Sequence, residues 1–116
     1  MTSEELRTVT VDFTKEERQA GFPLDVSEAK LDQYVKFFVE FADYNPQDGS
    51  GAIARFRIRH GDEWTFRVLD RIVQELRQPS IELAVTLDRE TLARWFEELS
   101  RRHRHVADHE LRPGVG

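Results

Sequence analysis

The sequence predicts an α+β fold: a ferredoxin-like βαββαβ sandwich, in which helices cover one face of an antiparallel sheet, with an additional C-terminal helix. Residues 8–13, 52–68 and 81–87 alternate apolar and polar side chains, which is typical of half-buried strands. Residues 27–44 and 69–78 instead place apolar side chains at intervals of three or four, which is typical of amphipathic helices. The order of these segments along the chain is the order of elements in that fold.

The first strand is expected at residues 8–13, where Val and Phe alternate with Thr and Asp. Thr14 and Glu17 have the spacing of a capping box and predict a short helical turn, which Gly21 and Pro23 end. The strand therefore leads into a brief, ordered connection.

Residues 27–44 contain many side chains that favour strands, yet the spacing of their polar side chains favours a helix. These polar residues are Lys30, Gln33, Lys36, Glu40 and Asp43. Asn45 and Pro46 then end the helix, because a residue before proline is disfavoured in the α conformation. The glycines that follow predict a loop at residues 45–51, the most mobile internal segment.

A β-hairpin is expected at residues 52–68, with a three-residue turn at residues 59–61. This register pairs Phe56 with Trp64 on an apolar face and leaves the other face charged. The alternation through residue 68 favours the hairpin over a helix that begins at Asp62. That alternative helix would have a polar stripe formed by Glu63, Arg67, Asp70, Arg71, Gln74, Glu75 and Gln78.

The period changes to a helical one after residue 68, and Pro79 ends the helix predicted at residues 69–78. Residues 81–87 are expected to form the last strand. Asp88 is the predicted cap of the final helix. The apolar face of that helix consists of Leu92, Trp95, Phe96 and Leu99.

The chain has 116 residues, enough for one hydrophobic core, and we expect a single domain at residues 1–104 with a flexible tail at residues 105–116. Its net charge of −5 argues against a protein whose whole surface attracts nucleic acid or anionic membranes.

No cysteine is present, which excludes disulfides and thiolate chemistry and is compatible with a reducing compartment. No stretch approaches the roughly 20 apolar residues of a membrane span. The sequence therefore predicts a cytoplasmic protein without a membrane partner.

The charged face of the hairpin is a candidate anion-binding site, because guanidinium groups bind phosphates and carboxylates in a bidentate manner. Its arginines are Arg55, Arg57, Arg59 and Arg67. Binding of nucleic acid or another polyanion through this face is an alternative function, although an ordinary solvated face is the simpler interpretation. The aromatic side chains of the hairpin point into the predicted core, so base stacking of the kind seen in RNA-recognition domains is disfavoured.

Signatures of catalysis are absent from the sequence: it contains no nucleophilic serine elbow, P-loop or dinucleotide-binding glycine pattern. We therefore expect no catalytic residues and no cofactor. His105 and His109 are four positions apart and could hold a metal ion, with oxygen ligands from Asp108 and Glu110. Basic residues at the end of a helix more commonly complement its dipole, so no metal site is expected.

Aromatic residues exceed what short helices and strands can bury, which predicts an exposed partner surface. The candidates are Phe37, Phe41, Tyr44, Trp95 and Phe96. Closure of the core by Trp95 and Phe96 is the alternative interpretation. Small domains commonly cover such surfaces by forming symmetric dimers. The leading hypothesis is therefore a small non-catalytic protein-interaction or regulatory module that forms a homodimer.

A third hypothesis is a carrier of a small apolar ligand. The predicted first strand and hairpin, followed by residues 86–92, resemble sterol-carrier-type domains over less than half of the chain. This resemblance implies an apolar ligand site, without naming the residues that would form it.

Overall fold

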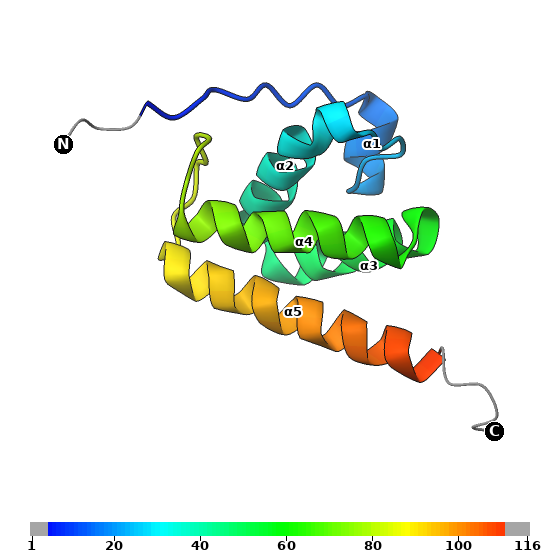
Figure 1. Cartoon of the computed structure of the whole chain (residues 1–116). Helices are drawn as coiled ribbons and strands as arrows, with labels where there is room; N and C mark the ends of the chain where they lie inside the picture. Colours follow the sequence, from blue (N-terminus) through cyan, green and yellow to red (C-terminus); the bar gives the residue numbers. More distant parts are fainter. Residues whose placement is uncertain (1–4, 111–116) are drawn as a thin grey trace.

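The computed structural model describes residues 5–110, with side chains described as far as Val106, and this part of the chain is helical (Figure 1). Its elements are α1 (Lys15–Ala20), a 3₁₀ turn η1 (Glu28–Lys30), α2 (Leu31–Tyr44), α3 (Pro46–His60), α4 (Asp62–Arg77) and α5 (Arg89–Glu110). The described residues contain no sheet, and their one β-type pairing is an isolated parallel bridge between Arg7 and Ile81. The predicted α+β ferredoxin-like sandwich is therefore wrong.

Helices α2, α3 and α4 follow one another with single-residue junctions, and α5 packs along α4 (Figure 1). The core lies between these four helices. Its largest fully buried apolar side chains are Tyr34, Phe38, Ile53, Phe56, Leu69, Ile72, Leu76, Ile81, Leu92 and Phe96. Each helix contributes residues three or four positions apart, which is the pattern that buries one face of a helix.

The predicted hairpin at residues 52–68 lies in α3 and α4. Gly61 separates the two helices with a φ of 93°, a value that favours glycine. The hairpin prediction failed because Ala52 and Phe56, four positions apart, share a face in a helix as well as in a strand. Ile58 shows the difference, since its side chain is 85% exposed although the strand pattern placed it in the core. The alternative helix that begins at Asp62 is confirmed.

The predicted mobile loop at residues 45–51 is the start of α3. Asn45 caps this helix by accepting a hydrogen bond from the backbone N–H of Asp48, and Pro46 occupies the first turn. Proline is favourable there because its missing N–H would have no helical partner. The same Asn-Pro pair that ends α2 therefore begins the next helix.

The predicted strand at residues 81–87 is an extended segment without a sheet. Its alternation is retained, with Ile81 and Leu83 buried. Most of its hydrogen bonds come from α2: Glu40 accepts from the backbone N–H of Ala84, and Asp43 accepts from the N–H groups of residues 86 and 87. Carboxylates on a helix thus supply the hydrogen-bond acceptors that a neighbouring strand would supply in a sheet. An alternating sequence pattern alone does not distinguish these two arrangements.

The other predicted strand, residues 8–13, is also extended and carries no sheet pairing beyond the Arg7–Ile81 bridge. The capping box that follows it is confirmed, since Thr14 and Glu17 exchange side-chain hydrogen bonds with each other's backbone. Without the strand and the hairpin, the resemblance to sterol-carrier-type domains has lost the elements on which it depended.

The helix predicted at residues 27–44 corresponds to η1 and α2. At the other end of the chain, residues 105–110 of the predicted tail lie in α5, and residues 111–116 are outside the described part.

Candidate functional site

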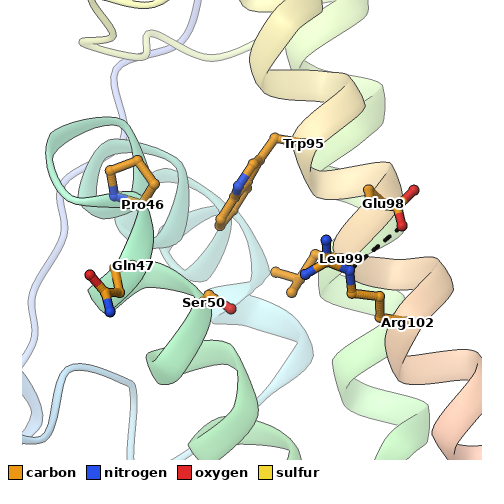
Figure 2. Close-up of a pocket in the computed structure, with 7 residues that line it drawn as sticks. All are labelled: Pro46, Gln47, Ser50, Trp95, Glu98, Leu99 and Arg102. Carbon is orange, nitrogen blue, oxygen red and sulfur yellow. Dashed lines mark ion pairs between the residues drawn. The ribbon is translucent and has the colours of Figure 1, made fainter.

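A groove lies between the first turns of α3 and the middle of α5. It has a volume of about 290 Å³ and is lined by Pro46, Gln47, Ser50, Trp95, Glu98, Leu99 and Arg102. Figure 2 shows the Trp95 side chain projecting from α5 toward the α3 turn that carries Pro46 and Ser50. We call this the α3–α5 groove.

A second hollow continues the α3–α5 groove along α5. It has a volume of about 450 Å³ and is lined by Glu98, Arg101, Arg102, His105 and Val106. Glu98 and Arg102 line both hollows, so the two hollows adjoin along α5. Val106 at its far end is 41% exposed.

Along this part of α5, the acidic residue Glu98 comes first and the basic residues follow it. Glu98 pairs with Arg101 and lies 3.6 Å from Arg102 (Figure 2). The sequence then continues with basic residues up to position 105. The groove therefore changes from an aromatic end at Trp95 to a basic end.

The five aromatic residues predicted to form a partner surface do not lie together. Phe37 packs against Phe13, with ring centroids 4.8 Å apart, and against Phe41, so both α2 residues are partly buried under the N-terminal segment. The α5 residue Phe96 is fully buried, as the alternative interpretation expected.

Two of the predicted partner residues do lie at the surface. Tyr44 is 87% exposed, at the corner where α2 leads into α3, two positions before Pro46 of the groove. Trp95 is partly buried, packs edge-on against Phe96 and lines the groove.

The four arginines of the predicted anion site form no common face. Arg55 and Arg59 donate hydrogen bonds to the backbone carbonyl groups of Ala20 and Leu24. They hold the connection after α1 onto α3, and Arg55 also lies over the ring of Phe22. These guanidinium groups therefore make contacts within the fold.

The other two predicted anion-site residues point elsewhere. Arg57 forms an ion pair with Asp62 across the α3–α4 junction. Arg67 of α4 pairs with Glu28, at 2.7 Å, and lies over the ring of Trp64. The alternation that aligned these arginines in the prediction followed a strand period, whereas helical residues two positions apart point in different directions.

Glu75 and His103 have shifted pKa values, and both lie at contacts between elements of the fold. Burial opposes ionisation of Glu75, but hydrogen bonds from Ser80 and Arg71 outweigh it and hold the pKa of Glu75 below its ordinary value. Burial lowers the pKa of His103, the nearby Arg57 lowers it further, and Asp62 opposes both effects. Glu75 secures the turn after α4, and His103 lies where α5 meets the α3–α4 junction.

No group of three or more His, Cys, Asp or Glu side chains within the described part of the chain is arranged to hold a metal ion. Of the four residues considered for such a site, His105 lies at the basic end of the groove. The side chains of Asp108, His109 and Glu110 are outside those described. Among residues 5–110, no helix combines the length and the apolar character needed to cross a bilayer.

Sequence reasoning missed the α3 side of the groove. Pro46, Gln47 and Ser50 were assigned to a loop, although an Asn-Pro pair is also a signal for the start of a helix. Arg102 was not a candidate residue in the sequence. Trp95 is the one groove residue that composition identified as a surface candidate.

The sequence matches no protein-family model, and no curated protein and no solved structure matches it. The function is therefore inferred from the geometry of the α3–α5 groove.

Proposed function

We propose that this protein is a small non-catalytic protein-interaction or regulatory module that acts as a homodimer and docks through the α3–α5 groove. The observation that carries the proposal is the pair of adjoining hollows along α5, which extend from Trp95 to the exposed Val106. A groove beside a helix, with apolar side chains such as Trp95 and Leu99 in its lining, is the kind of surface into which another helix packs.

The residues of the groove support a protein as the ligand. Tryptophan and arginine are enriched among the residues that contribute most to protein–protein binding, and here Trp95 and Arg102 line the same groove. Tyr44 at the adjacent corner adds a large exposed aromatic side chain. The groove is open along its length, which suits an extended helical surface better than a small molecule.

The cytoplasm is the proposed compartment, because a chain without cysteine needs no oxidising environment to fold. Polyanion binding through Arg55, Arg57, Arg59 and Arg67 remains a weaker alternative. Their guanidinium groups already bind carbonyl groups or carboxylates of the fold.

Sedimentation equilibrium over a range of protein concentrations tests the proposal. We expect a mass of twice 13.6 kDa for the full chain. We expect Trp95→Ala to raise the dimer dissociation constant about 30-fold, since truncation of a central tryptophan costs about 2 kcal/mol of binding free energy. Val106→Glu, at a more exposed position, keeps the test valid if Trp95→Ala also loosens the fold.

Leu87→Ala is the matched control, because Leu87 is 42% exposed, close to the 41% of Val106, and lines neither hollow. Its dissociation constant should equal that of the unmodified chain. A mass of one chain at all concentrations up to about 1 mM would contradict the proposed homodimer.

A further inference from the structure

We infer that α5 of a second copy packs into the groove, antiparallel to α5 of the first copy. A two-fold axis relates the two helices and passes between them at the level of residue 100. This inference rests on the proposed function and adds the occupant's orientation and its contacts. It depends on the order of four residues on one side of α5. We call them the α5 flank: Trp95, Glu98, Arg102 and Val106.

The α5 flank lies beside the buried face of α5, with Trp95 partly buried and Arg102 and Val106 exposed. Leu92, Ala93, Phe96, Leu99 and Ser100 are the buried residues of this helix. The flank residues are spaced by three or four positions, which places them along one side of a helix, and they span about 17 Å of its axis. Glu98 and Arg102 have side chains that are 46% and 72% exposed. This side of α5 is therefore accessible to a partner over about three helical turns.

The α5 flank is complementary to the α5 flank of a second copy that runs in the opposite direction. From residue 95 to residue 106 it carries an aromatic, an acidic, a basic and an aliphatic side chain. A second copy in the opposite direction places Trp95 beside Val106 of the partner subunit and Glu98 beside Arg102 of the partner subunit. A two-fold axis repeats each contact, so the surface is self-complementary as an isologous interface requires. A parallel copy would instead set like charges against each other.

The contacts within one chain leave Arg102 able to change partner. Its distance of 3.6 Å from Glu98 exceeds the 2.7–2.9 Å typical of a direct charge-assisted hydrogen bond. Glu98 has Arg101 as a second local partner. In the dimer, the two exposed intrahelical pairs, one in each subunit, are exchanged for two intermolecular pairs in a drier environment, and these pairs fix the register of the two helices.

Charge reversal tests the register. Glu98→Arg and Arg102→Glu each turn two attractive contacts into two repulsive ones, so each variant alone should have a dimer dissociation constant raised about tenfold or more. In an equimolar mixture of the two variants, the mixed dimer places an arginine of one subunit beside a glutamate of the other in both contacts. The mixture should therefore dimerise about as tightly as the unmodified chain, and the double variant Glu98→Arg/Arg102→Glu should do the same.

Arg94→Glu is the matched control, because Arg94 is exposed on the same helix and lines neither hollow. Its dissociation constant should be unchanged. Recovery of dimer in the mixture also shows that both single variants are folded.

Three results would overturn the register. The single variants could associate as tightly as the unmodified chain, Arg94→Glu could weaken association as much as they do, or the mixture and the double variant could stay dissociated. With a dimeric unmodified chain, each of these leaves the proposed function standing. An unmodified chain that stays monomeric contradicts the homodimer itself, so the two failures are distinguishable.

Discussion

Gly49 of α3 lies directly against Ala42 of α2: a Cβ atom at position 49 would be 2.8 Å from both the Cα and the Cβ atoms of Ala42. Gly49→Ala would therefore force the two helices apart. We expect it to lower the free energy of unfolding by about 1–3 kcal/mol, the usual cost of overpacking. Urea denaturation measures this change.

Gly51→Ala is the matched control in the same helix. A Cβ atom there would meet only the flexible end of Arg55, at 3.3 Å. Since alanine is the better helix former, this variant should gain about 0.5–1 kcal/mol of stability. Equal losses in both variants would contradict close packing at Gly49.

Glu75→Gln should destabilise the protein by about 1.5–3 kcal/mol at neutral pH, because the buried carboxylate accepts hydrogen bonds from Ser80, Ile81 and Arg71. The folded pKa of Glu75 lies below its ordinary value, so its ionised form stabilises the fold above about pH 4.3. This contribution is lost as the pH falls through the folded pKa.

Unfolding free energies measured as a function of pH test this expectation for Glu75. The difference between the unmodified chain and Glu75→Gln should shrink in acid. Glu63→Gln, at an exposed position of the same helix, should cost less stability at neutral pH than Glu75→Gln. A difference for Glu75→Gln that stays constant from neutral to acid pH would be inconsistent with a depressed pKa.

Asp43→Ala should free the connection before α5. Asp43 accepts hydrogen bonds from the backbone N–H groups of Thr86 and Leu87, and these bonds keep its pKa low although burial opposes them. We expect faster hydrogen exchange at both amides and a loss of about 1–2 kcal/mol of stability. Amides in the middle of α4 serve as the internal reference. Unchanged exchange at Thr86 and Leu87 would show that another group holds this segment.

His103 should make the fold acid-sensitive near neutrality. Its pKa is lowered by burial and by Arg57, against a smaller opposing effect of Asp62. The unfolded chain then binds more protons than the folded one, so stability is full above about pH 6.5 and is lost as the pH falls toward the folded pKa. His103→Gln should lose less stability than the unmodified chain between about pH 7 and pH 5. An NMR titration that gives His103 a pKa at or above about 6.5 would contradict this.

Some local features could be predicted from the sequence because neighbouring residues determine them. The Thr14–Glu17 capping box, the helix at residues 27–44 and the polar stripe that begins at Asp62 are of this kind. The alternation at residues 81–87 correctly identified an extended segment with one buried side, but the backbone partners of that segment come from α2, about 40 residues earlier.

The sheet was predicted wrongly because two periods agree over short stretches. Ala52 and Phe56 fit a strand and a helix equally, whereas the exposed Ile58 and the buried Ile53 fit only the helix. The groove could not be predicted for a related reason. Trp95 was a visible candidate, but its neighbours Pro46 and Ser50 come close only through the packing of α3 beside α5.

The single-residue junctions at Asn45 and Gly61 have a consequence for the order of folding. They place α2, α3 and α4 next to one another in sequence, so most of the contacts between these helices close short loops, which form quickly. The hydrogen bonds between Arg7 and the backbone of residues 80 and 82 instead close a loop that contains α1, α2, α3 and α4. Such a loop closes at a high entropic cost. The N-terminal segment is therefore the last part of the chain expected to dock, onto helices that have already assembled.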